Sequence, residues 1–341
     1  MSSRFLSLTL LFIAASVASA AETLHVFTWA DYIDSALVKR FEKTHGCKVA
    51  IDTFDSNESM YAKLKAGAGG YDLVFPSSYI IPQMVQQGMI QELDQTKLPN
   101  IANIDPEVLD KVADKTMKHG VPYTLGYTVI GYRKDKVKNI EASWSTLART
   151  DLKKRVTLLN DMRETIGAAL KSLGYSMNTR DEKELNEARD VLIGWKKGIT
   201  KFDNEAYKAG VDSGEFVVVH GYGGDLWQVM QRNKKVGVVI PAEGVSVACD
   251  EMVIPKSAPN TALAHQFIDY LLDGKNAAQN MQSIGYLCPN SAALKIVGKE
   301  FLQNPALTIS AEVKLKSEVI QDIGEDLKKY TKVWDEVKAA R

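Results

Sequence analysis

The hydrophobic positions at the start of the chain follow two alternating periods, one typical of buried strands and one of amphipathic helices. Short apolar runs predict strands at 24–28, 48–54 and 71–75. Between these runs, apolar residues recur every three or four positions, which predicts helices at 34–45 and 57–66. Strands that alternate with helices indicate a mostly parallel sheet with helices on both faces.

The remainder of the chain repeats this pattern less regularly and predicts a second α/β unit. Two extended stretches, 121–132 and 249–255, are expected to cross from one unit to the other and back. Further strands are expected at 155–159, 215–220 and 236–240, and further helices at 161–173, 181–197, 226–232, 261–272, 275–283 and 313–340. We therefore expect the α/β class, with two lobes, each a mostly parallel sheet flanked by helices, and a hinged cleft between them.

The two lobes are expected to be discontinuous, because no linker separates them in the sequence. The N-terminal lobe would hold 21–127 plus 249–310, and the C-terminal lobe 128–248 plus 311–341. Residues 1–20 are expected to be a signal peptide. Arg4 precedes an apolar run too short to span a membrane, and Ala18-Ser19-Ala20 fits a cleavage site. These features predict a soluble, exported, periplasmic protein without membrane insertion.

The charge balance and the cysteines limit the classes of partner. The chain has 42 Lys and Arg against 42 Asp and Glu, which argues against nucleic acid or an anionic membrane as the partner. Its 3 cysteines cannot all pair within one chain, and Cys249 with Cys288 is the candidate disulfide. No spacing of Cys and His resembles a metal site, so neither a metal nor another cofactor is expected.

The loop after the first predicted strand places two aromatic rings around a carboxylate. Trp29, Asp31 and Tyr32 lie where a strand ends and a helix begins, which is where open α/β sheets bind their ligands. Ring faces attract an organic cation, and a carboxylate pairs with it. The alternative is that Trp29 packs in the core and Asp31 caps the next helix, and this stretch alone does not separate the two.

Other segments carry the same combination of acids, hydroxyls and rings. Their candidate residues are Ser77, Tyr79, Asp161, Glu164, Tyr222, Asp225, Asp250 and Tyr286. Each has a structural alternative, such as helix capping or packing within a loop. The glycine-rich segment 221–225 is expected to be a loop that allows close backbone approach. Because Arg163 is the only Lys or Arg in these segments, the set favours a ligand with more than one positive charge.

In order and spacing these motifs resemble those of the periplasmic polyamine-binding proteins of ABC importers, the spermidine/putrescine class. The motifs are Phe27-Thr28-Trp29-Ala30-Asp31-Tyr32, Tyr71-Asp72-Leu73-Val74-Phe75-Pro76-Ser77, Asp161-Met162-Arg163-Glu164 with Leu173-Gly174-Tyr175, and Ile284-Gly285-Tyr286 with Pro289-Asn290. The resemblance implies a two-lobed protein that closes on putrescine or spermidine and delivers it to an inner-membrane ABC permease.

The resemblance also implies a role for each candidate residue. Trp29 and Tyr32 would flank the ligand, while Ser77 and Tyr79 would line the floor of the cleft. Tyr286 would close one side, and Gln321 would be a polar contact at the end of the pocket. The acids that would pair with ammonium groups are Asp161, Glu164, Asp225 and Asp250.

Two positions depart from the pattern of the family and leave the preferred polyamine open. Tyr222 stands where the family usually has Trp, and Ala248 stands where it has a large aromatic residue. Three other functions remain as alternatives. One is a polyamine sensor that signals through a membrane receptor. Another is an enzyme on the same fold, for which Cys249 is the only thiol beside the site. The third is a ferric-ion carrier, for which the chain lacks adjacent tyrosines with His or carboxylate ligands.

Overall fold

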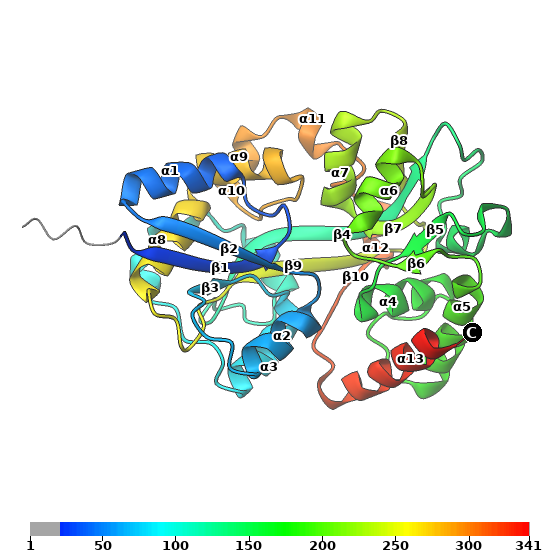
Figure 1. Ribbon diagram of the computed structural model, residues 1–341, viewed down its shortest axis with the longest axis horizontal. Helices are drawn as coiled ribbons and strands as arrows, with labels where there is room; N and C mark the ends of the chain where they lie inside the picture. Colours follow the sequence, from blue (N-terminus) through cyan, green and yellow to red (C-terminus); the bar gives the residue numbers. More distant parts are fainter. Residues whose placement is uncertain (1–20, 341) are drawn as a thin grey trace, which may run out of the picture.

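The computed structural model describes residues 21–340, which form two α/β lobes joined across the middle of the molecule (Figure 1). The signal peptide predicted at 1–20 lies outside the described residues. We call the lobe built around β1–β3 the N-terminal lobe and the lobe built around β5–β8 the C-terminal lobe. Among residues 21–340, no helix is both long enough and apolar enough to cross a membrane.

The N-terminal lobe has a three-stranded parallel sheet in the order β2-β1-β3. Its strands are β1 (Thr23–Trp29), β2 (Lys48–Phe54) and β3 (Leu73–Val74). Its helices are α1 (Ser35–His45), α2 (Asn57–Lys65), α3 (Ile81–Gln86), α8 (Thr261–Leu272), α9 (Gly274–Ile284), α10 (Ser291–Ile296) and α11 (Lys299–Leu302). Short 3₁₀ helices cover Ser78–Ile80, Gln95–Lys97, Pro99–Asn103 and Pro106–Lys111.

The C-terminal lobe contains most of a larger, mixed sheet in the order β10-β9-β4-β7-β5-β6, with β8 paired to β4. The strands are β4 (Val121–Arg133), β5 (Val156–Leu158), β6 (Lys201–Phe202), β7 (Val218–Tyr222), β8 (Val236–Val239), β9 (Ser246–Met252) and β10 (Glu318–Val319). The helices are α4 (Met162–Ser172), α5 (Glu182–Lys196), α6 (Ala206–Ser213), α7 (Gly223–Arg232), α12 (Ala311–Lys316) and α13 (Leu327–Ala339). Further 3₁₀ helices cover Trp144–Ala148, Thr150–Leu152 and Gly324–Asp326.

Two long strands, β4 and β9, run through the centre and connect the lobes (Figure 1). The first part of β4, up to Tyr127, pairs antiparallel with β9, and the part after it pairs with β7 and β8. Isolated bridges then tie β9 to β3, and one of them places Ser77 opposite Asp250. The predicted extended crossovers are therefore present, while the exact lobe boundaries at 127/128 and 248/249 stay a prediction.

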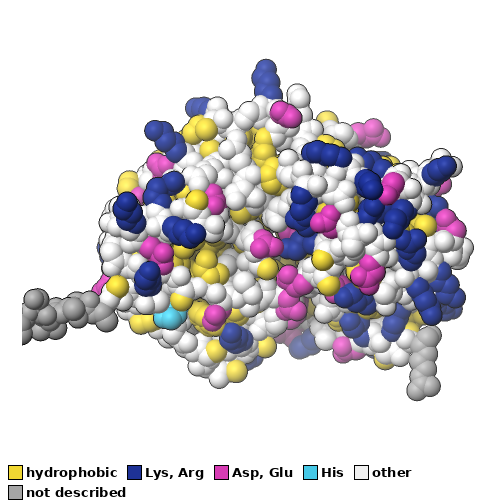
Figure 2. Space-filling model, turned by 45° about the horizontal axis from the view of Figure 1, so that its top comes forward, with side chains coloured by type: hydrophobic (Ala, Val, Ile, Leu, Met, Phe, Trp, Pro, Cys, Tyr) yellow, Lys and Arg dark blue, Asp and Glu magenta, His cyan; other side chains and the backbone are white. Residues whose placement is uncertain are grey.

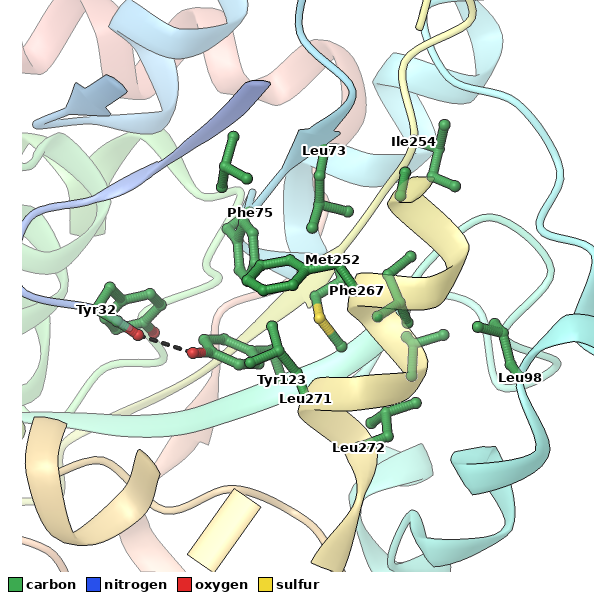
Figure 3. Close-up of a cluster of buried hydrophobic side chains, with 14 of the residues drawn as sticks. Tyr32, Leu73, Phe75, Leu98, Tyr123, Met252, Ile254, Phe267, Leu271 and Leu272 are labelled. Carbon is green, nitrogen blue, oxygen red and sulfur yellow. Dashed lines mark hydrogen bonds between the residues drawn. The ribbon is translucent and has the colours of Figure 1, made fainter. Parts of the chain in front are cut away.

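A cluster of buried side chains holds the N-terminal lobe against the central strands (Figure 3). Phe75 packs edge-on against Tyr123 of β4, with ring centroids 4.8 Å apart. The Tyr123 hydroxyl donates to the backbone carbonyl of Tyr32 at 2.8 Å. This bond fixes the loop after β1 to the crossover strand. Each fully buried side chain of this size contributes roughly 1.5–3 kcal/mol of stability.

Caps define where the helices beside the carboxyl ends of the strands begin. Asp34 caps α1 by accepting a hydrogen bond from the Ala36 amide at 2.8 Å. Asp161 caps α4 in the same way, accepting from the Glu164 amide at 3.0 Å. The predicted capping role of Asp161 is therefore confirmed, whereas the cap of α1 is Asp34 and not Asp31.

The glycine-rich segment 221–225 is not the loop that the sequence predicts. β7 continues to Tyr222 and α7 begins directly at Gly223. A Cβ at Gly223 would overlap the Ala306 carbonyl oxygen, and one at Gly224 would overlap the Tyr286 ring. The glycines are therefore required for close packing and not for flexibility.

Two other predictions are wrong. The predicted terminal helix 313–340 is divided, because β10 inserts after α12 and pairs with β9 before α13 begins. The candidate disulfide does not form: Cys47, Cys249 and Cys288 are all buried free thiols.

We expect Gly223→Ala to lower the free energy of unfolding by about 1–3 kcal/mol, because the added methyl group meets backbone that cannot move aside. Gly194→Ala is the matched control. Gly194 lies exposed in α5 with no atom within 4 Å of an added Cβ, so its replacement should stabilise the protein by roughly 0.5–1 kcal/mol. Urea unfolding followed by circular dichroism measures both. Equal stability of the two variants would contradict the packing role of Gly223.

Candidate functional site

A cavity of about 70 Å³ lies between the lobes, at the carboxyl ends of their strands. Roughly 10–15 Å³ of such space holds one water molecule, so the cavity accommodates a small elongated molecule. Figure 2 shows several acidic side chains along the middle of one face of the molecule, where the lobes meet. The cavity is lined by Trp29, Ala30, Tyr32, Asp55, Asn57, Ser77, Tyr79, Gly126, Tyr127, Thr128, Asp161, Glu164, Asn204, Glu205, Lys208, Tyr222, Asp225, Ala248, Asp250, Tyr286 and Ile320.

Asp250 on β9 is the acid on the N-terminal side of the cavity. Its carboxylate accepts hydrogen bonds from the Ser77 hydroxyl, at 2.6 Å, and from the Tyr32 hydroxyl. Asn57 fixes Ser77 in turn, since its side chain bonds both the Ser77 amide and the Ser77 hydroxyl at 3.0 Å. Burial raises the pKa of Asp250 to about 6, although the bonds from Ser77 and Tyr32 oppose the shift.

Asp161 and Glu164 form an acidic pair at the start of α4, on the C-terminal side. Asp161 uses one oxygen to cap the helix and accepts from the Tyr222 hydroxyl with the other, at 3.2 Å. Glu164 accepts from the Thr128 hydroxyl at 2.9 Å. Burial raises the pKa of Glu164, and the neighbouring charge of Asp161 raises it further. The two acids therefore resist being ionised together.

Asp225, in the first turn of α7, is the fourth acid of the site, and it is buried. It accepts from the Tyr207 hydroxyl at 2.7 Å and from the Tyr286 hydroxyl at 3.1 Å. The ammonium of Lys208 lies 3.8 Å from it. Burial raises the pKa of Asp225, while Lys208 opposes the increase.

Aromatic rings form the walls between these acids. The Trp29 indole donates to the Phe75 carbonyl at 2.9 Å and also lines the cavity. Trp29 can therefore pack against the core and contact a ligand at the same time. Tyr286 contacts Tyr32 edge-on, with ring centroids 5.2 Å apart. Methylene groups of a ligand could pack on these rings while charged ends meet the carboxylates.

Two predicted residues do not line the cavity. Asp31 is exposed and forms an ion pair with Lys208 at 2.9 Å. The exposed Gln321 belongs to a separate hollow with Asn178 and Asp322, and Ile320 takes the place in the cavity wall.

Several lining residues were not predicted from the sequence, although some of them obey the rule that identified the others. Asp55 and Asn57 follow the carboxyl end of β2, and Asn204 and Glu205 follow that of β6. A position just after a strand is therefore a usable sequence signal for a residue that lines the cavity. Lys208 carried none, because it lies in the middle of α6.

Ala248 and Gly126 lie opposite each other on β9 and β4. Neither has a ring, so the wall there is formed by their backbone and by Tyr286, which would lie 3.4 Å from a Cβ at Gly126. Among residues 21–340, no group of His, Cys, Asp and Glu is arranged to hold a metal ion.

Comparison with known proteins identifies relatives across almost the whole chain. Residues 36–309 match the family model described as bacterial extracellular solute-binding protein. A putrescine/cadaverine-binding protein of Pseudomonas aeruginosa is 35% identical over 352 residues, which cover 99% of each chain. A spermidine/putrescine-binding periplasmic protein of Escherichia coli is 35% identical over 331 residues, covering 96% of this chain and 95% of the relative.

The fold agrees with these matches. The solved structure described as a putative spermidine/putrescine ABC transporter from Listeria monocytogenes superimposes with a TM-score of 0.87 at 33% identity, covering 94% of this chain and 100% of the other. The expected two-lobed α/β class is thereby confirmed. The chain therefore belongs to the family of bacterial extracellular solute-binding proteins.

Proposed function

We propose that the protein captures a linear polyamine such as putrescine or spermidine in the interlobe cavity and delivers it to an ABC permease. One observation carries the proposal: three buried carboxylates and one half-buried carboxylate, from both lobes, converge on a cavity walled by aromatic rings. These acids are Asp161, Glu164, Asp225 and Asp250. A ligand with several ammonium groups and a flexible apolar chain matches this arrangement of charges and rings.

The relatives support the same class of ligand and the same cellular role. Their names describe putrescine, cadaverine and spermidine binding, in several cases in the periplasm. A periplasmic binding protein that hands its ligand to a permease accounts for the two lobes, which would open to load and release.

Binding without chemical conversion agrees with the state of the only thiol near the cavity. Cys249 is buried, and burial raises the pKa of its thiol well above the ordinary value. A nucleophilic cysteine requires the opposite shift. The carboxylates of the cavity lie beside aromatic rings and hydroxyl groups, and this arrangement suits binding of a cation.

Isothermal titration calorimetry with putrescine and with 4-aminobutyrate tests the proposal directly. The second compound has a similar chain but replaces one ammonium with a carboxylate. We expect binding of putrescine and no detectable binding of 4-aminobutyrate, because a ligand carboxylate would be repelled by the acids of the cavity, and the cation that lines it, Lys208, already lies beside Asp31 and Asp225. Equal affinity for both compounds, or binding of neither putrescine nor spermidine, would contradict the proposal.

We expect Asp250→Ala and Asp225→Ala each to weaken polyamine binding at least about tenfold. The first leaves a ligand ammonium without its partner, which costs roughly 2–5 kcal/mol. The second leaves the charge of Lys208 in the cavity balanced only by exposed acids such as Asp31, so that it repels the ligand. Asp335→Ala, an exposed change on α13, is the matched control and should bind as the unmodified protein does. Calorimetry gives the affinities, and circular dichroism verifies the fold. Unchanged affinity in both cavity variants would place the site elsewhere.

Affinity for putrescine should also fall as the pH drops below about 6, by up to about tenfold per pH unit. Asp250 is ionised above its pKa of about 6 and protonated below it, so at lower pH the ligand must first displace a proton. Alkyl amines, with a pKa of about 10, stay charged throughout. Calorimetry between pH about 5 and 8 measures the profile. In Asp250→Asn the step near pH 6 should disappear, and an unchanged step would assign it to another group.

A further inference from the structure

Lys208 brings a positive charge of the protein itself into the acidic cavity. Its ammonium lies 2.9 Å from an oxygen of Asp31 and 3.8 Å from one of Asp225, and only 13% of its side chain is exposed. Glu205 lines the same part of the cavity. Burial lowers the pKa of Lys208, but Asp225, Asp31 and Glu205 together raise it above the ordinary value, so the side chain stays charged.

The contacts of Lys208 come from both lobes. Lys208 lies on α6 and Asp225 on α7, in the C-terminal lobe, whereas Asp31 belongs to the loop after β1. Asp31 adopts a φ of 54°, a left-handed conformation that is uncommon for residues other than glycine. In this conformation the carboxylate of Asp31 forms its ion pair with Lys208 across the cleft. Lys208 therefore occupies the position where a ligand ammonium would find Asp225.

The charges that remain for a ligand are fewer than the number of acids. Lys208 bonds the exposed Asp31, and its charge also offsets that of the buried Asp225, which already accepts bonds from two tyrosine hydroxyls. Asp161 and Glu164 are neighbours at the start of α4, and burial and the charge of Asp161 raise the pKa of Glu164 to about 8, so the pair carries about one negative charge at neutral pH. That pair supplies one negative charge and Asp250 supplies a second. Two ammonium groups satisfy these withdrawn acids, since the other lining acids, Asp55 and Glu205, are exposed to solvent.

We propose that Lys208 determines selectivity by acting as a built-in ammonium at Asp225, so that the cavity prefers a diamine to a triamine. The proposal rests on the polyamine-binding function above and specifies it further. A diamine would pair with Asp250 and with the Asp161–Glu164 pair. The third ammonium of a triamine would approach Lys208, whose like charge repels it and whose partner acid is already paired.

Lys208→Met removes the charge while keeping most of the side chain volume, and Lys208→Ala also opens space. In both variants the ratio of the spermidine dissociation constant to that of putrescine should fall at least about tenfold, because Asp225 becomes available to a third ammonium. Lys234→Met is the matched control, since Lys234 is exposed, bonds the Met230 carbonyl of α7 and lies outside the cavity lining. Its ratio should equal that of the unmodified protein.

Asp31→Asn tests whether Lys208 affects ligand selectivity or only the closure of the lobes. It breaks the ion pair between the lobes but leaves Lys208 beside Asp225, so the spermidine-to-putrescine ratio should stay unchanged whatever happens to the absolute affinities. If Lys208→Met changes both affinities by the same factor, or neither, Lys208 is at most a link between the lobes and the proposal is wrong.

A measurement on the unmodified protein makes the test independent of whether the Lys208 variants fold. N-propylputrescine has the length of spermidine but lacks its terminal amine. The unmodified protein should bind it at least as tightly as spermidine, because the third ammonium gains no partner. Tighter binding of spermidine by tenfold or more would overturn the role of Lys208 and leave the polyamine function standing. Failure to bind putrescine, spermidine and N-propylputrescine alike would instead refute the polyamine function.

Discussion

Burial of several like charges in one cavity is the constraint on which the site depends. Asp161, Glu164 and Asp225 are buried and Asp250 is half-buried, which disfavours their charged forms, and the four carboxylates repel one another. Hydroxyl groups offset part of this cost, because each carboxylate accepts at least one hydrogen bond from a tyrosine, serine or threonine. A bound polycation would cancel the repulsion between the carboxylates. The free energy that this repulsion costs the protein without ligand would then contribute to binding.

The central strands hold this arrangement in place from both sides. β9 carries Asp250, and its bridge to Ser77 sets the distance between an acid and its donor by backbone pairing. β4 carries Thr128, which bonds Glu164, and it is tied through Tyr123 to the loop that contains Tyr32. One pair of strands therefore positions groups of both lobes. Because the lobes meet at these strands, closing the cleft can assemble the set without rearranging either core.

The sequence predicted most of the fold and site because both follow from the ends of strands. Trp29, Ser77 and Asp161 each follow a strand, and the structure brings all three to one cavity. The failures have specific causes. The segment 221–225 was expected to be a loop, but β7 and α7 occupy it, and its glycines allow α7 to pack closely against other parts of the chain. Lys208 acts through tertiary contacts with segments more than one element away, and no local pattern marks it.

The charge of the site differs from that of the chain, which is balanced overall. Selectivity then depends on how many acids remain without a partner after the protein has supplied its own donors. Tyr222 illustrates this dependence. Its ring forms part of the cavity wall, and its hydroxyl donates a hydrogen bond to Asp161. An indole at this position would present its N–H donor from a different point. Each internal donor or cation reduces the charge that a ligand must bring. A change of one tyrosine or lysine can therefore alter the preferred number of amines while the fold and the acids stay the same.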